Sequence, residues 1–174
     1  MNFYSRHMSM SVMSDPIIMP LLSPVGLEIV CDGAQHSRTE KTKNIANLPL
    51  VQKYLNVCVN SSDTHVSATN CSICSKCLRT MMALDSLGIL DKFDTVFDLS
   101  KWKKLSFKYK CEQIVLYDKN VFAQDNVDFA RANGKHLPNR MIAYLVVICY
   151  KILSLPKRVL GRIKRMINGN KTNH

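Results

Sequence analysis

The feature that most constrains this chain is a group of four cysteines that lie close together in the sequence. Cys58, Cys71, Cys74 and Cys77 follow the spacing Cys-x12-Cys-x2-Cys-x2-Cys. Zinc prefers soft thiolate ligands in a tetrahedron, and a gap of two residues lets both sulfurs of one turn face the same ion. The spacing therefore predicts a structural zinc site in which protein sulfurs fill all four positions and leave none for water.

Two other chemistries compete for these cysteines. Iron–sulfur clusters use Cys-x2-Cys-x2-Cys runs, although this run lacks the Cys-Pro that usually completes them. A redox dithiol would use one Cys-x2-Cys pair and leave the other two cysteines unexplained. His65 lies between Cys58 and Cys71, so it is a candidate to replace one sulfur or to hydrogen-bond to a ligand, although a solvent-exposed loop histidine is the commoner case.

The cysteine content also bears on location. The chain has seven cysteines, an odd number, and four of them cluster too closely for the scattered framework of a secreted disulfide-bonded domain. Residues 1–14 contain no sustained apolar segment and no small-residue cleavage site, so no secretory signal is predicted. We therefore expect a cytoplasmic protein, in which Cys31, Cys111 and Cys149 are buried free thiols.

The charge of the chain is concentrated at one end. Of 24 basic and 13 acidic residues, ten basic and no acidic residues lie between positions 129 and 174, which leaves the first 128 residues nearly neutral. This asymmetry predicts an anionic partner for the tail, either a membrane surface or a nucleic acid. The near-neutral charge around the cysteines argues against a nucleic-acid-binding zinc ribbon.

The 174 residues suit one domain with a tail, which we divide into three parts. Residues 1–24 are predicted to be irregular because three prolines fall between positions 16 and 24. Residues 25–128 form the predicted zinc-bearing body, and residues 129–174 form the tail. Within the body, the apolar run Leu27–Cys31, closed by Asp32-Gly33, predicts a short strand and turn.

Most of the body is predicted to be helical. Ser37 and Glu40 form a capping box, so a helix should start near Arg38 and run to about Asn47. Apolar residues at helical spacing follow Ser75, and this helix should anchor the last cysteines to the core, with Met81 and Met82 as core residues rather than metal ligands. Further helical segments are expected over residues 51–59, around residues 93–105, and as two short helices within residues 111–133.

The tail combines an apolar and a basic segment. Residues 141–155 are almost wholly apolar but shorter than the roughly 20 residues that a membrane-spanning helix needs. After Pro156, apolar residues recur on one helical face, and four cations are candidates for membrane or partner contact: Arg158, Arg162, Lys164 and Arg165. Such a helix can lie peripherally on an anionic membrane surface, here the inner face of the cell membrane, or pack on the body or a partner chain.

Several short motifs resemble the C-terminal part of PP-loop ATP pyrophosphatases, most nearly the 7-cyano-7-deazaguanine synthases and uncharacterised bacterial relatives. The match covers about Pro20 to Asp98 and rests on these residues: Asp32-Gly33-Ala34, Ser37-Arg38-Thr39-Glu40-Lys41, Cys58, and Asn70-Cys71-x-x-Cys74-x-Lys76-Cys77-Leu78-Arg79-Thr80-Met81. The resemblance implies structural zinc on the four cysteines. It also implies a mostly helical fold with a little β structure, the C-terminal portion of an α/β domain of the HUP or PP-loop type.

The chain also departs from that family. The Ser-Gly-Gly-x-Asp-Ser loop that cradles pyrophosphate is absent, and no other glycine-rich phosphate loop replaces it. The resemblance therefore implies a fragment or subunit that is inactive alone and needs a separate ATP-binding half, toward which Asp32, Arg38 and Lys41 would face. The alternatives are a non-enzymatic zinc-containing interaction module that docks through its basic tail, and an accessory protein of surface-polysaccharide biosynthesis.

Overall fold

The computed structural model describes residues 19–30, 36–58 and 69–169, and within its last helix it describes side chains only up to residue 154. The regular elements of these ranges are all helices. They are η2 (Met19–Leu22), α1 (Arg38–Ile45), α2 (Pro49–Tyr54), α3 (Ser75–Ser86), η3 (Leu90–Phe93), α4 (Leu99–Val115), α5 (Val121–Ala132) and α6 (Arg140–Gly169).

The expected α/β architecture is wrong, because the described part of the chain contains no strand and no sheet. Residues 27–30, the described part of the predicted strand, are irregular, and Leu27 and Val30 are largely exposed. Their local hydrogen bond runs from the Ile29 amide to the Ser23 hydroxyl rather than to a neighbouring strand. A single extended segment has no partner for its backbone groups, so it does not form a sheet.

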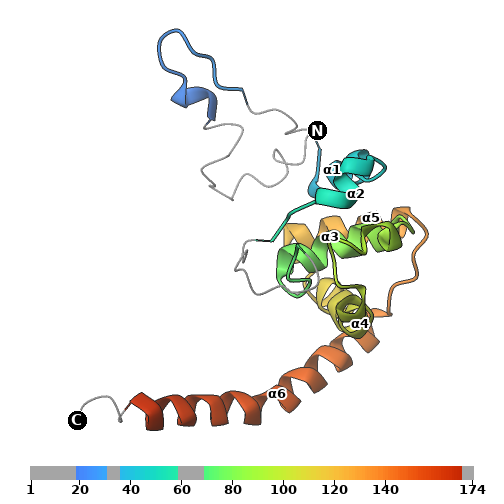
Figure 1. Cartoon of the computed structure of the whole chain (residues 1–174). Coiled ribbons are helices and arrows are strands. Elements are labelled where there is room, and N and C mark those ends of the chain that lie inside the picture. The colour runs from blue at the N-terminus through green and yellow to red at the C-terminus, as the bar shows by residue number, and fades with distance from the viewer. Residues whose placement is uncertain (1–18, 31–35, 59–68, 170–174) are drawn as a thin grey trace.

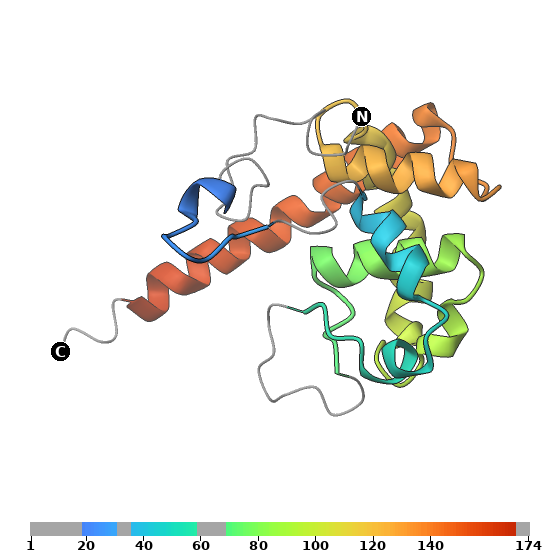
Figure 2. The same cartoon turned by 90° about the horizontal axis from the view of Figure 1, so that it is seen from above.

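The helical body is built around α3. Helices α4 and α5 pack against α3 and against each other, and α1 packs on α3 and α5. Figure 1 and Figure 2 show these helices gathered at one end of the molecule, with α6 extending away from them. The body is therefore a bundle of short helices that places the start of α3, where the cysteines lie, against the core.

Local sequence signals explain where several helices begin. The capping box is confirmed at α1: Ser37 Oγ accepts a hydrogen bond from the Glu40 amide, and Glu40 Oε2 accepts one from the Ser37 amide at 2.7 Å. Asn120 caps α5 in the same way, by accepting from the amides of Phe122 and Ala123. These side chains satisfy amide groups that would otherwise lack partners in the first turn.

The predicted helix positions are close to the observed ones, with two differences. Helix α2 starts at Pro49 and ends at Tyr54, so Cys58 lies after it in irregular chain. Helix α4 is a single helix of 17 residues through Val115, so the first of the two short helices expected within residues 111–133 is the end of a longer one.

Two groups of buried apolar side chains form the interior. The cysteine-side core consists of Ala46, Cys71, Cys77, Met81, Met82, Leu84, Leu90, Phe93, Val96, Phe97, Trp102, Tyr109 and Ala130. The α6-side core is smaller and consists of Cys111, Ile114, Val127 and Ala143. The placement of Met81 and Met82 in the core rather than at the metal is confirmed, since both are fully buried.

The tail forms one continuous helix of 30 residues, α6, instead of an apolar segment followed by a separate helix. Its first turns pack along α4 and contribute Ala143 to the α6-side core. Pro156 has no amide hydrogen to bond the carbonyl of Ile152, a loss that commonly bends a helix, and Figure 1 shows α6 changing direction along its length. No helix among the described residues is long and apolar enough to cross a membrane.

Candidate metal centre

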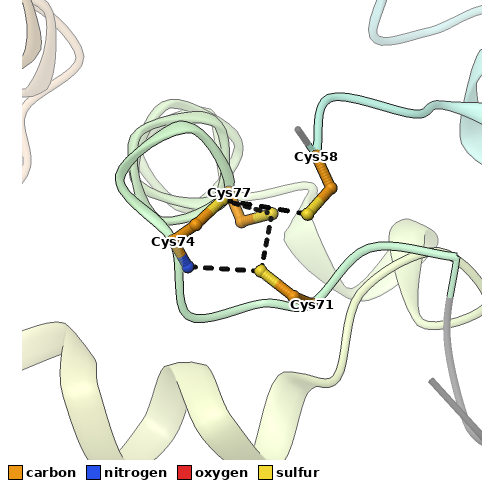
Figure 3. Close-up of side chains that lie close together, drawn as sticks. All are labelled: Cys58, Cys71, Cys74 and Cys77. Atoms are coloured by element: carbon orange, nitrogen blue, oxygen red, sulfur yellow. Dashed lines mark hydrogen bonds between the residues drawn. The ribbon is translucent and has the colours of Figure 1, made fainter. Parts of the chain in front are cut away.

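The four predicted cysteines lie together at the start of α3. Cys58 comes from the irregular chain after α2, Cys71 and Cys74 from the loop before α3, and Cys77 from the first turn of α3 (Figure 3). One sulfur from each residue lies within 4.8 Å of all the others. The sequence prediction that these four residues share one site is therefore confirmed.

The distances between the sulfurs match a single tetrahedral ion. Three of the six distances are 3.3 Å between Cys74 and Cys77, 3.7 Å between Cys71 and Cys77, and 3.9 Å between Cys58 and Cys74, and none of the six exceeds 4.8 Å. A zinc–sulfur bond of about 2.3 Å places tetrahedral sulfurs about 3.8 Å apart. A disulfide needs about 2.05 Å, so these sulfurs are arranged as separate ligands rather than as bonded pairs.

The loop before α3 holds its sulfurs through the backbone. The amide of Cys74 donates to Cys71 Sγ at 3.3 Å (Figure 3), and Cys74 is the N-cap residue of α3. An amide N–H and the N-terminal end of a helix both carry partial positive charge. The loop therefore places Cys71 Sγ beside an electropositive part of the backbone.

Ser72 makes the sharp turn within this loop. Its φ angle is 61°, in the left-handed region that residues other than glycine rarely occupy. The buried Ser72 hydroxyl accepts from the Asp98 amide at 2.8 Å and lies 3.2 Å from the Asn70 carbonyl oxygen. The strained turn is therefore fixed to the start of α4, and glycine at this position would lose that attachment.

Asn70 joins the two parts of the chain that carry the cysteines. Its side-chain oxygen accepts from the amides of Val57 and Cys58, at 2.9 and 3.1 Å. Its side-chain nitrogen donates to the carbonyls of Leu55 and Val96, at 2.8 and 3.0 Å. Asn70 is 1% exposed. Its buried side chain therefore connects the segment that carries Cys58 to the loop before α3.

A cation from α4 also lies near the cysteines. Lys101 Nζ donates to the carbonyl of Cys71 at 3.4 Å and forms an ion pair with Asp98 at 3.5 Å. Asp98 in turn caps α4 by accepting from the amides of Ser100 and Lys101. A cation beside this loop would favour a site that held four thiolates and one divalent ion, because the net charge of such a site is negative.

Burial shapes the chemistry of Cys77. Burial, followed by hydrogen bonding with Cys74, raises the pKa of the Cys77 thiol far above its usual value of 9.0. A free thiol in this position would stay protonated, whereas a bound metal ion deprotonates its sulfur ligands outright. Cys71 and Cys77 are buried, and Cys58 and Cys74 are partly exposed.

The other predicted site residues differ in how far the structure describes them. Asp32 and His65 lie outside the described residues. Arg38 and Lys41 are exposed on α1, while the buried Thr39 between them binds Asp125 of α5 through its hydroxyl at 2.8 Å. The backbone of α6 includes Arg158, Arg162, Lys164 and Arg165, whose side chains are not described.

Cys111 and Cys149 have different surroundings. Cys111 is fully buried, as predicted, and burial raises the pKa of its thiol. Cys149 is exposed on α6, so the expectation that it is buried is wrong. Its apolar sequence neighbours also lie on the exposed part of α6, which a count of apolar residues cannot reveal. Cys31 lies outside the described residues.

A second group of polar residues lies between α3, α4 and α5, and sequence spacing gave no sign of it. The Arg79 guanidinium stacks on the Phe122 ring at 4.0 Å from its centre, and burial lowers the pKa of Arg79. Burial raises the pKa of Tyr109 to about 12, although the nearby Arg79 charge opposes this shift. Arg79 Nε and Asn126 Oδ1 are buried without a hydrogen-bond partner among the described residues.

Comparisons of the chain with protein-family models, curated proteins and solved structures find no match. The function is therefore argued from the site itself.

Proposed function

We propose that the chain is a helical module whose fold is held by one structural zinc ion on Cys58, Cys71, Cys74 and Cys77. The observation that carries this proposal is the convergence of four sulfurs within 4.8 Å of one another. Structural zinc sites are tetrahedral and use four such ligands. The proposed role of the metal is to fasten the chain after α2 to the start of α3.

The spacing of the sulfurs favours a single ion over the two alternatives. A cluster of two or four irons holds its outer thiolates further apart, because the inorganic core lies between them. A redox dithiol needs one pair that can close to about 2.05 Å, whereas sulfurs from all four cysteines lie at similar separations. A single tetrahedral ion accounts for all four residues at once.

The ligand set favours a structural metal over a catalytic one. Catalytic zinc keeps one position for water or substrate, whereas four protein sulfurs fill the coordination shell. The Ser72 turn, the Asn70 hydrogen bonds and the Lys101 side chain all act on the loop geometry. The metal is therefore proposed to stabilise the fold rather than to catalyse a reaction.

Elemental analysis of the full chain, purified without added metal, tests the proposal. One zinc per chain is expected. Cys74→Ser should abolish zinc binding, while Cys149→Ser, which changes an exposed cysteine on α6, should leave the stoichiometry unchanged. Iron together with visible absorption would indicate an iron–sulfur cluster instead of zinc. A chain that is folded without any metal would also overturn the proposal.

A further inference from the structure

The outer face of α6 carries a row of exposed apolar side chains. On the inner face, Ala143 is buried and Val146 and Val147 pack against the α6-side core. At 3.6 residues per turn, positions three or four apart starting at residue 141 fall on the opposite side of the helix. We call these residues the α6 stripe: Met141, Leu145, Ile148 and Ile152, which are 74%, 62%, 49% and 57% exposed.

Further apolar residues widen the α6 stripe. Ile142 and Leu153 beside it are 50% and 69% exposed, and Cys149 is exposed between them. Single exposed apolar residues are common on protein surfaces, but a contiguous row along more than three helical turns marks a surface that contacts something else. Among the described residues, α4 packs along α6, and Figures 1 and 2 show most of α6 extending away from the body.

The sequence continues the α6 stripe beyond residue 154. Steps of seven residues, close to two helical turns, lead from Leu145 and Ile152 to Val159 and Met166. The backbone remains helical through Gly169. The cations of this half are Lys157, Arg158, Arg162, Lys164 and Arg165, and none of them falls on those seven-residue steps. An apolar row with cations elsewhere on the helix is the pattern of a helix that lies in a membrane interface.

Charge identifies the occupant of this surface. Residues 129–174 contain ten basic and no acidic residues, so a second copy of α6 packed on the first would bring like charges together. A surface of anionic lipid instead offers acyl chains to the apolar row and phosphates to the cations. We infer that α6 lies flat in the interface of an anionic membrane, with the α6 stripe inserted among the acyl chains.

Vesicle flotation with the full zinc-loaded chain tests this inference. The chain should float with vesicles that contain phosphatidylglycerol and much less with vesicles of phosphatidylcholine alone. Leu145→Glu with Ile152→Glu should lower the partition coefficient about tenfold or more, because two aliphatic side chains no longer enter the membrane and two charges would have to. Both positions are exposed in the free protein, so the double variant should fold normally.

A matched control adds the same charge elsewhere. Leu48→Glu with Leu50→Glu changes two leucines that are 52% and 72% exposed at the start of α2. This variant should float nearly as well as the wild type, since α2 is not part of the proposed surface. An equal loss of binding in both double variants would show that net charge alone drives flotation, and it would overturn the insertion of the α6 stripe.

A reporter on the α6 stripe separates insertion from other occupants. The chain has a single tryptophan, Trp102, which is 5% exposed on α4, so Ile148→Trp adds a second tryptophan at the proposed depth. Lipids brominated on their acyl chains should quench the added fluorescence. A protein that shows no quenching, but forms dimers that the Leu145→Glu with Ile152→Glu variant dissolves, would assign the α6 stripe to a second copy and overturn the membrane inference.

Discussion

The cysteine-side core and the α6-side core are built from similar residues but are completed in different ways. The cysteine-side core has many large, fully buried side chains, among them Phe93 and Phe97, and it includes two of the proposed metal ligands, Cys71 and Cys77. The α6-side core has four buried residues, and the helix that closes it exposes apolar side chains on its other face. In the cysteine-side core, the proposed metal would link residues of this chain to one another. Beside the α6-side core, α6 exposes apolar surface that a partner could cover.

This difference shows how a small helical body can be stable without a sheet. The chain segments that supply Cys58 and the α3 loop are joined by the Asn70 hydrogen bonds and the grouped sulfurs, and Leu55 and Val57 also pack against the cysteine-side core. Short helices with few local contacts need additional crosslinks, and a structural metal provides one. The α6 side has long helices that pack along each other, α4 and α6, so it needs no such crosslink.

The largest effect should come from removing the metal. Apparent binding free energies of structural zinc in small peptides are about 10–16 kcal/mol near neutral pH, so chelation should unfold the chain around the cysteines. Hydrogen exchange should increase first over residues 55–58 and 69–78 and at the start of α3. The contact between α4 and α6 should stay protected longer, because none of its residues is a metal ligand.

Hydrogen exchange followed by mass spectrometry, with and without a zinc chelator, checks this order. Re-addition of zinc should restore protection in the cysteine segments. Equal loss of protection in both cores would show that the two cores unfold as one unit and would break the comparison.

The next largest effect should come from large-to-small changes in the two cores. Phe93→Ala should lower the free energy of unfolding by about 4 kcal/mol, because Phe93 is fully buried in the cysteine-side core. Ile114→Ala, in the smaller α6-side core, should lower it by about 2 kcal/mol. Urea unfolding of both zinc-loaded variants measures the difference, and a larger loss from Ile114→Ala would reverse the ranking of the cores.

An effect between those of Phe93→Ala and Ile114→Ala is expected from Asn70→Ala, which tests how the cysteine-side core is held together. The change leaves two amides and two carbonyls without their side-chain partner, and the expected loss is about 3 kcal/mol. Zinc affinity should fall as well, since Cys58 would no longer be held next to the α3 loop. Asn133→Ala is the control, because that side chain makes one hydrogen bond, to the Phe129 carbonyl at the end of α5.

The sequence predicted the grouping of the four cysteines because the spacing of cysteines is a local property of the chain. It also predicted the capping box at Ser37 and the core positions of Met81 and Met82. It could not predict the roles of Asn70 and Ser72, because these depend on segments that are distant in sequence, such as the amide of Asp98. Polar residues next to cysteines have no spacing rule that identifies such contacts.

The errors have physical causes as well. The run that starts at Leu27 has the composition of a strand, but the described residues offer it no neighbouring strand. Pro156 suggested a break in the tail, yet the structure continues α6 through it. The resemblance to PP-loop ATP pyrophosphatases and the separate ATP-binding half it implies stay predictions, while the α/β fold that came with them is contradicted by the helical body.

The smallest expected effect concerns Asp98, which caps α4 beside the loop that carries Cys71 and Cys74. Its hydrogen bond with the Ser100 hydroxyl, more than its ion pair with Lys101, lowers the pKa of this carboxyl. A lowered pKa in the folded state contributes stability above the unfolded pKa, and this contribution is lost as pH falls through the folded pKa. Asp98→Asn keeps an oxygen for the cap but removes the charge. The variant should therefore be slightly less stable than the wild type at neutral pH, and this difference should vanish in acid. Thermal unfolding across pH, with exposed Asp94→Asn as the control, measures this. A stability difference that is independent of pH would assign the effect to cap geometry instead of charge.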